Sequence, residues 1–264
     1  MNNIKSIIWE MIPGNGPVIA AAIHDGHDLR DEVKEIISLT ENERLREEDP
    51  FTGVMTKAGD MQIIGLRSRF EIDLNRPREK AVYLNPEDSW GLKVWKKELP
   101  DLIKQTSLDE YDAFYNEMFR IFSELKNKYK HFVVLDIHSY NHMREGPEGK
   151  AADPLANPEV NIGTGTIDQN YWGSIVKGFM DDLKKADFLG RTLDVRENVK
   201  FRGGNFSRWI NETFPLSGCA IAIEFKKFFM DEWTGIPDKV QLEAIQKILE
   251  STIPCIRQNL NMMK

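Results

Sequence analysis

The most chemically suggestive residues of this 264-residue sequence are two histidines and a glutamate in otherwise apolar surroundings. His24 and His138 each end a mostly apolar run, and Glu224 lies inside the run Cys219–Phe225. An ionised carboxylate is unfavourable in an apolar interior unless it is paired or binds a metal, so Glu224 is the strongest single signal of a general base or a ligand. Two histidines and one carboxylate also suit a zinc ion that keeps a fourth position open for water. These residues favour a metal-dependent hydrolytic site.

Each of these residues also has a plainer interpretation when it is considered alone. A histidine at the end of a strand is more often a hydrogen-bonded core residue, and Glu224 would be structural if it paired with Lys226 or Lys227. The metal hypothesis depends on the two histidines meeting Glu224 at one edge of a sheet. In α/β folds, sites lie at the edge formed by the carboxyl ends of the strands.

Further candidates flank this group. The third metal ligand is left open between His27, three residues after His24, and an acid of the pair Glu48–Asp49. Arg76 suits an anionic substrate because a guanidinium binds a carboxylate through two parallel hydrogen bonds, although it is equally a surface arginine before a proline. The pair Gly203–Gly204 indicates either a tight turn or a close approach of the backbone to a ligand.

Apolar runs and segments with helical spacing alternate along the chain, which predicts an α/β fold with a mixed, mainly parallel central sheet flanked by helices. We expect a single catalytic domain over residues 1–264. Strands are expected at 4–12, 17–23, 61–66, 70–74, 133–140, 193–199 and 219–225, and helices at 28–39, 51–58, 108–129, 167–185, 206–213 and 240–260. The charged segment 40–49 is expected mainly as a solvated helix face, and residues 142–166 as a functional loop.

The composition excludes several classes of protein. With 35 Lys and Arg against 42 Asp and Glu, the net charge is −7, which argues against a nucleic-acid partner but allows a local cationic pocket for a small acid. The two cysteines, Cys219 and Cys255, form no CxxC pair, which fits a reducing compartment and argues against a thiolate zinc site. Because the first residues match neither a signal peptide nor a membrane span, we expect a cytoplasmic protein without a membrane partner. The oligomeric state is left open.

Three short motifs follow an early strand that ends in His24: Asp73-Leu74-Asn75-Arg76, Asp136-Ile137-His138-Ser139-Tyr140 and Ile223-Glu224-Phe225. In this order they resemble the N-formylglutamate amidohydrolase family, which is similar to the zinc carboxypeptidases and the aspartoacylases. The most specific match is the stretch 68–76 (SRFEIDLNR). The resemblance covers roughly residues 17–235 in scattered motifs, and it implies a core like that of the zinc carboxypeptidases.

The resemblance also implies roles for individual residues. His24 and His138 are expected to bind one zinc ion, and Glu224 corresponds to the base that activates water. Asn75 and Arg76 correspond to the pair that grips the substrate carboxylate in carboxypeptidase-like enzymes. Arg69, which lies in the most specific stretch, joins them as an expected substrate-binding residue.

The remaining correspondences concern a glycine corner and the third ligand. The corner that precedes the catalytic strand matches Arg202-Gly203-Gly204, so Arg202 and Gly204 are expected to contact substrate. Carboxypeptidases carry His-x-x-Glu, whereas here the fourth position is His27. An Asp shortly before a helix is expected in the relatives of formylglutamate type, and Asp49 occupies that place. The expected third ligand is therefore Asp49, followed by His27 and then Glu48.

These inferences lead to a hydrolase that cleaves an N-acyl amino acid, such as an N-formyl one, or a similar small amide with a free carboxylate. Two alternatives use the same residues. One is a zinc carboxypeptidase that acts on short peptides, and the other is a protein of the same fold that binds a metal or a small acid without catalysis.

Overall fold

The apolar runs form the central strands of a sheet that is covered on both faces. The computed structural model describes residues 4–263, and its strands β3, β5 and β8 are buried along nearly their whole length. Alternate residues of these strands belong to two separate apolar clusters, one on each face of the sheet. This double burial explains why the central strands read as continuous apolar runs.

Eight strands build the sheet within the described residues, in the order β1-β2-β4-β3-β5-β8-β6-β7. The central strands β4, β3, β5 and β8 run parallel, whereas β1, β2 and β6 pair antiparallel to a neighbour. The strands are β1 (Ile4–Lys5), β2 (Trp9–Ile12), β3 (Val18–Ala22), β4 (Met61–Gly65), β5 (Phe132–Tyr140), β6 (Val160–Gly163), β7 (Val195–Glu197) and β8 (Gly218–Lys226). The predicted mixed, mainly parallel α/β sheet is thereby confirmed.

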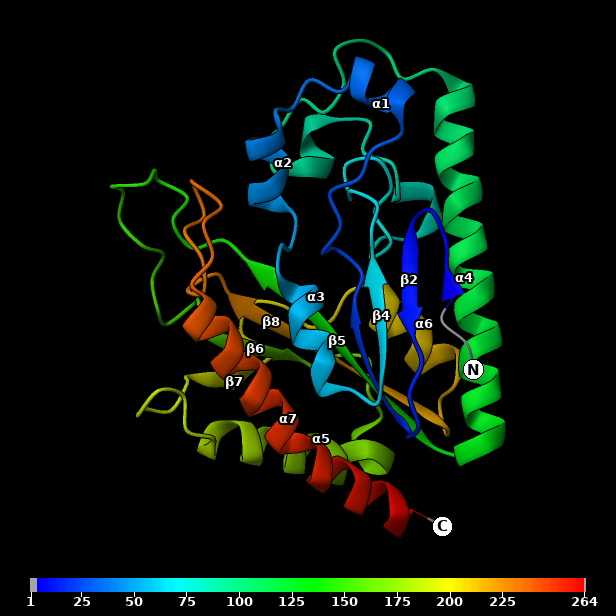
Figure 1. Ribbon diagram of the computed structural model, residues 1–264, viewed down its shortest axis with the longest axis vertical. Coiled ribbons are helices and arrows are strands. Elements are labelled where there is room, and N and C mark those ends of the chain that lie inside the picture. The colour runs from blue at the N-terminus through cyan, green and yellow to red at the C-terminus, as the bar shows by residue number, and fades with distance from the viewer. Residues whose placement is uncertain (1–3, 264) are drawn as a thin grey trace.

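Helices cover the sheet on both sides, with α4 and α6 on one side and α5 and α7 on the other (Figure 1). The α-helices are α1 (Asp31–Ile36), α2 (Glu41–Glu47), α3 (Thr52–Met55), α4 (Asp101–Tyr129), α5 (Gln169–Lys185), α6 (Asn205–Thr213) and α7 (Lys239–Met262). Short 3-10 turns are η1 (Thr56–Ala58), η2 (Arg78–Lys80) and η3 (Pro86–Ser89). The short helices α1 and α2 follow β3 and lie beyond the carboxyl ends of the central strands, and α3 then returns onto the face of the sheet that α7 covers (Figure 1).

Several local predictions are wrong. Residues 70–74 form turns rather than a strand, and their buried side chains face the centre of the molecule. The segment 142–166 is not one loop, because β6 lies within it and pairs with β8. The segment 4–12 forms two strands, and the helix expected at 28–39 is shortened to α1.

The charged segment 40–49 departs from expectation in its burial. It contains α2 as predicted, but Arg44, Glu47, Glu48 and Asp49 are buried rather than solvated. The last of these residues lies at the edge where β3 and β5 end.

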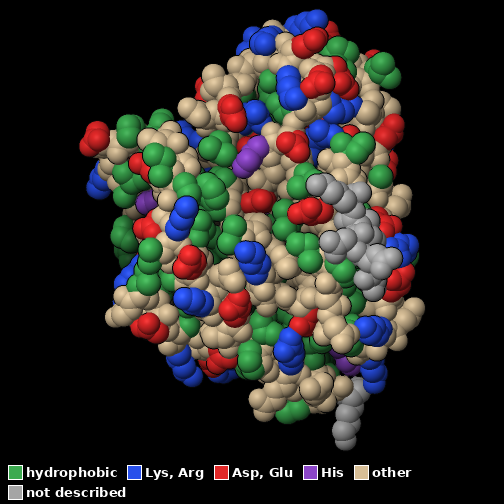
Figure 2. Space-filling view, in the orientation of Figure 1, with side chains coloured by type: hydrophobic (Ala, Val, Ile, Leu, Met, Phe, Trp, Pro, Cys, Tyr) green, Lys and Arg blue, Asp and Glu red, His purple; other side chains and the backbone are tan. Residues whose placement is uncertain are grey.

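On the face shown in Figure 2, acidic and basic side chains are interspersed, without a broad basic area. This agrees with the net charge of −7. Among residues 4–263, no helix combines the length and the apolar character that crossing a membrane requires. The single catalytic domain over residues 1–264 stays a prediction.

Candidate metal centre and active site

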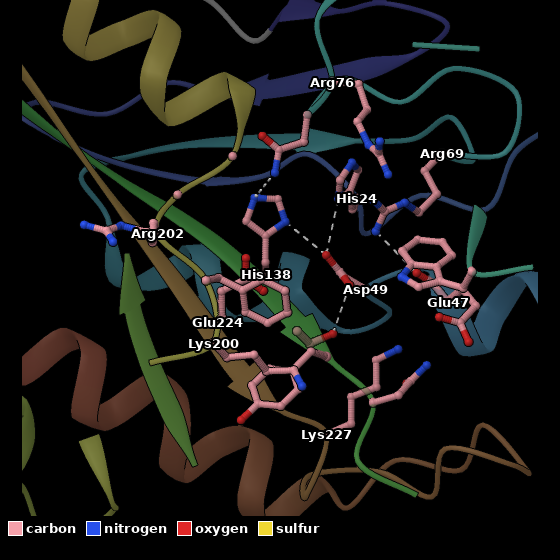
Figure 3. A pocket seen from close by; sticks show the side chains of 18 of the residues that line it. His24, Glu47, Asp49, Arg69, Arg76, His138, Lys200, Arg202, Glu224 and Lys227 are labelled. Atoms are coloured by element: carbon pink, nitrogen blue, oxygen red, sulfur yellow. Dashed lines mark hydrogen bonds and ion pairs between the residues drawn. The ribbon is translucent and has the colours of Figure 1, made fainter. Parts of the chain in front are cut away.

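Three side chains converge at the carboxyl ends of the central strands. One ring nitrogen of His24, one of His138 and a carboxylate oxygen of Asp49 all lie within 4.8 Å of one another (Figure 3). Oδ2 of Asp49 is 3.4 Å from Nδ1 of His24 and 3.0 Å from Nδ1 of His138. All three residues are at most 2% exposed, so the group is closed from most directions.

The fold brings these ligand atoms together from three different elements. His24 follows β3 by two residues, His138 belongs to β5, and Asp49 follows the end of α2. The backbone N–H of Asp49 donates to the carbonyl oxygen of His24 at 3.0 Å, which ties the segment after α2 to the end of β3. The hydroxyl of Ser139 donates to the other carboxylate oxygen of Asp49 at 3.2 Å.

Each histidine is backed by a buried carboxylate on its other ring nitrogen. Nε2 of His24 lies 2.7 Å from Oδ1 of Asp73, and Nε2 of His138 lies 2.9 Å from Oδ1 of Asp136. We assign the proton of each ring to Nε2, because an ionised carboxylate can only accept. In the metal-free protein, Nδ1 of His138 also faces a carboxylate, that of Asp49 at 3.0 Å, so it carries a proton that a metal ion would displace. Each Nδ1 would then present a lone pair to the ion, which is the arrangement that carboxylates impose on metal-binding histidines.

The group fits a divalent metal ion. Nδ1 of His24 is a buried polar atom without a hydrogen-bond partner within the described part of the chain, and a metal would satisfy it. Two imidazole nitrogens and one carboxylate oxygen form a three-ligand set that leaves a fourth position for water or substrate.

The surroundings keep Asp49 ionised. Burial alone would raise the pKa of Asp49, but the hydrogen bond with His138 and the attraction of both imidazoles outweigh it and hold the pKa well below its usual range. The pKa of Asp73 is also lowered, because the attraction of Arg69 and the bond from His24 outweigh burial. A negative ligand and a negative backing carboxylate are thus present at neutral pH.

Glu224 lies beside this group in a contrasting environment. It is the direct partner of His138 across the β5–β8 pairing, so both side chains project from the same face of the sheet. Burial raises the pKa of Glu224 to about 7. The charge of His138 opposes this shift and the charge of Asp49 adds to it, both with smaller effects. A carboxylate with a pKa near neutrality is suited to accepting and returning a proton.

Asn75 and Arg76 line the same cavity as Glu224. Arg76 and Glu224 lie on different sides of His138 (Figure 3). Oδ1 of Asn75 accepts from the backbone N–H of Phe206 at 2.9 Å, which fixes the amide against the start of α6. Its Nδ2 lies 3.3 Å from Nε2 of His138, which donates to Asp136, so the amide N–H groups remain for a substrate oxygen.

Arg69 and Arg76, which both line this cavity, differ in how far they are already engaged. The guanidinium of Arg69 donates to Asp73 at 2.9 Å and to Tyr83 at 3.2 Å, and it lies over the ring of Trp90. Arg76 is 36% exposed, with one bond to a backbone carbonyl and a distant contact of 3.8 Å to Asp73. Arg76 is therefore the better placed of the two to bind a substrate carboxylate.

The glycine corner at Gly203–Gly204 affects the site through its backbone conformation and not through a charged side chain. Gly203 has a φ of +109°, which favours glycine, and a Cβ at Gly204 would lie 2.2 Å from Nδ2 of Asn75. Gly204 is thus needed for the close approach of Asn75. The side chain of Arg202 is exposed and points away from His138 (Figure 3).

The alternative third ligands lie outside the group. Nδ1 of His27 bonds Oε2 of Glu48 at 2.7 Å, and Glu48 also accepts from Ser68. Burial would lower the pKa of His27, but the bond to Glu48 outweighs it and raises the pKa. The geometry therefore favours Asp49 over His27 and Glu48.

A cavity of about 400 Å³ is lined by the three candidate metal ligands together with Glu224, Asn75 and Arg76. Several further residues line it to which the sequence assigned no role: Glu47, Trp90, Arg144, Lys200 and Lys227. Sequence patterns also missed the backing role of Asp73 and Asp136, although both occur in the quoted motifs. The spacing Asp136-x-His138 was the available signal, because residues two apart in a strand face the same side.

Comparison with known proteins gives the following matches. A sequence model described as N-formylglutamate amidohydrolase matches residues 16–230, which is more than half of the chain. The structure of an N-formylglutamate amidohydrolase from Ralstonia eutropha superposes with a TM-score of 0.74 at 14% identity, over 97% of this chain and 98% of that chain. A gene product of Agrobacterium tumefaciens superposes with a TM-score of 0.64 at 14% identity, over 96% of each chain. No curated protein matches the sequence.

The first prediction separates Asp49 from His27. Asp49→Asn should weaken Zn²⁺ binding by more than about 100-fold, because even residues behind a ligand contribute about 10–100-fold. His27→Ala should leave the dissociation constant within about threefold. Competition with a chromophoric chelator measures both dissociation constants. If His27→Ala weakened Zn²⁺ binding more than Asp49→Asn, Asp49 would not be a ligand.

The second prediction concerns stability of the metal-free protein. The pKa of Glu224 is about 7 when folded against 4.5 as its ordinary value, so the folded state retains a proton that the unfolded chain releases. Its stabilising contribution is complete below pH 4.5 and is lost as the pH rises to about 7. The free energy of unfolding of Glu224→Gln minus that of the wild type should rise over this range and level off above it. Urea titrations with a chelator present measure this difference, and a flat profile would contradict the burial effect.

Proposed function

The chain belongs to the N-formylglutamate amidohydrolase family, and from this premise we propose that it is a zinc-dependent hydrolase of an N-acyl amino acid, such as an N-formyl one. Membership confirms the resemblance read from the motifs, and it identifies a hydrolase of an amide bond. The observation that carries the proposal is the convergence of His24, Asp49 and His138 beside the Glu224 carboxylate. Two histidines and a carboxylate favour zinc over harder cations that prefer oxygen ligands.

In the proposed reaction, His24, Asp49 and His138 would hold a zinc ion, which would supply Lewis acidity toward the amide carbonyl and toward water. Glu224 removes a proton from the attacking water and returns it to the leaving nitrogen, as its raised pKa allows. The buried position of Glu224 keeps its carboxylate weakly solvated, so it is poised for proton transfer at neutral pH.

The carboxylate of the substrate is proposed to bind at Arg76, with Asn75 holding a second oxygen. Arg76 retains free donors, and the Asn75 amide is fixed by the start of α6. Fixing the substrate in this way aligns its amide with the attacking water, which is the main contribution of positioning groups. Arg69 and Gly204 support this pair, Arg69 by neutralising Asp73 and Gly204 by admitting Asn75.

The proposed partner is a small carboxylate-bearing molecule. A cavity of about 400 Å³ suits an amino acid derivative rather than a large polymer. The cytoplasmic location stays a prediction that rests on the sequence and on the two unpaired cysteines, Cys219 and Cys255.

The third prediction tests the base. Glu224→Gln should lower kcat on N-formyl and N-acetyl amino acids by roughly 10²–10⁴-fold, because the amide cannot accept the proton. Zn²⁺ should remain bound. Glu212→Gln on the exposed side of α6 is the matched control and should keep full turnover.

A substrate panel distinguishes the alternatives in the same assay. Short peptides with a free carboxyl terminus are compared with the acyl amino acids. Turnover of the peptides alone would indicate a carboxypeptidase, and a zinc-loaded protein that turns over neither class would indicate a non-catalytic binder. Turnover of Glu224→Gln within a few-fold of wild type would rule out Glu224 as the base.

The fourth prediction tests the carboxylate clamp. Arg76→Ala should lower kcat/KM by about 10–100-fold, mainly through KM, because a charge-assisted hydrogen bond contributes about 1.5–3 kcal/mol. Arg78→Ala is the control, since Arg78 pairs with Asp112 on the surface and does not line the cavity. Equal effects of the two substitutions would contradict the assignment.

A further inference from the structure

Lys227 is a buried cation that the proposed reaction does not use. It follows the last residue of β8, is 1% exposed and lines the cavity. Within residues 4–263, no carboxylate lies within 4 Å of its ammonium group, and burial lowers its pKa to about 8. Burying an ammonium group is costly unless other groups replace its lost water, so its hydrogen bonds need a structural or functional reason.

The ammonium group of Lys227 bonds only backbone carbonyls. Nζ donates to the carbonyl oxygen of Arg46 at 2.6 Å and to that of Glu48 at 2.7 Å. Both carbonyls lie at the carboxyl end of α2, where the last carbonyls of a helix lack partners and carry partial negative charge. Lys227 therefore caps α2 from a strand that is distant in sequence.

One of these carbonyls belongs to the peptide group that precedes Asp49. The same peptide group contributes the N–H of Asp49, which donates to the carbonyl oxygen of His24 at 3.0 Å. The peptide plane is thus held at its oxygen by Lys227 and at its nitrogen by His24. Fixing this plane fixes the N–Cα bond of Asp49. The carbonyl oxygen of Asp49 accepts from the hydroxyl of Thr52 at 2.6 Å, which limits rotation about that bond, so the two anchors together set the direction of the Asp49 side chain.

We infer that Lys227 is a positioning residue of the metal centre, which directs the Asp49 carboxylate toward His24 and His138 by holding the peptide before it. The inference rests on the proposed function, because it takes Asp49 as a ligand. Lys227 follows Glu224 by three residues, so the end of β8 provides both the proposed base and the residue that orients Asp49, the proposed third ligand. Figure 3 shows Lys227 on the side of Asp49 away from His138.

The test compares two neighbouring lysines. Lys227→Met keeps the apolar stem and removes the ammonium group. Lys226→Met is the matched control, because Nζ of Lys226 also donates to a backbone carbonyl, that of Asn157 at 3.2 Å, but away from the centre. Chelator-stripped proteins are titrated with Zn²⁺ in competition with a chromophoric chelator, and the visible spectrum of each Co²⁺ complex is recorded.

Lys227→Met should raise the dissociation constant for Zn²⁺ by about 10–100-fold, which is the usual effect of groups that support a ligand, and should shift the Co²⁺ bands. Lys226→Met should change neither by more than about threefold. The Co²⁺ spectrum reports ligand geometry, which a general loss of stability in a folded variant would leave unchanged.

Wild-type protein that binds no metal would refute the proposed function itself. Wild-type binding with unchanged affinity and spectrum in Lys227→Met would overturn only the inference about Lys227. If Lys227→Met kept the zinc affinity and the Co²⁺ spectrum but raised KM, the inference would also be overturned, because Lys227 would then contact the substrate rather than position Asp49. If Lys227→Met does not fold, Lys227→Leu, which also removes the donors, is judged by the same criteria.

Discussion

The candidate site depends on two hydrogen bonds that lie behind it, from Nε2 of His24 to Asp73 and from Nε2 of His138 to Asp136. Each bond sets the tautomer and the rotation of an imidazole, so that both Nδ1 atoms face Asp49. Asp73 does more than orient His24, because it also accepts from Arg69 and from the backbone N–H of Asn75. One fully buried carboxylate thereby places a proposed ligand and the proposed carboxylate clamp in a fixed relation.

The sheet adds a second constraint through its register. Because His138 and Glu224 are directly paired on adjacent parallel strands, the proposed base cannot move relative to the ligand without breaking the central pairing. Asp49 and Glu224, two of the carboxylates that line the cavity, have contrasting environments. Asp49 is surrounded by imidazoles and has a lowered pKa, whereas Glu224 is dominated by burial and has a raised pKa. Such a separation lets one carboxylate stay charged while the other exchanges a proton.

The parts of the fold that could be predicted from the sequence are those that follow from local patterns of apolar and polar residues. The runs around β3, β5 and β8 are apolar because both faces are buried, and this pattern is visible without a structure. Residues 70–74 alternate like a strand, yet Asp73 and its side-chain bonds hold them in turns. β6 has only four residues between polar flanks, so it carried too short a pattern to detect.

The site was harder to predict where contacts join distant residues. His24, His138 and Glu224 were recognisable because each stands out in an apolar run. Asp49 does not stand out in this way, because it lies in a charged segment and contacts His138 across 89 residues of sequence. Two backbone carbonyls of that segment also accept from Lys227, which is farther still along the chain. The roles of these residues stay predictions until they are tested in solution.

The wide spacing of the three converging residues links the centre to folding. An unfolded chain cannot hold residues 24, 49 and 138 together, so a metal ion at this centre would bind the native state far better than the unfolded one. At a free metal concentration of 100 times the dissociation constant, such linkage adds about 2.7 kcal/mol of stability by mass action. The lifetime of the protein in a cell would then follow the local supply of metal, and scarcity would expose it to proteolysis before its catalytic residues were damaged.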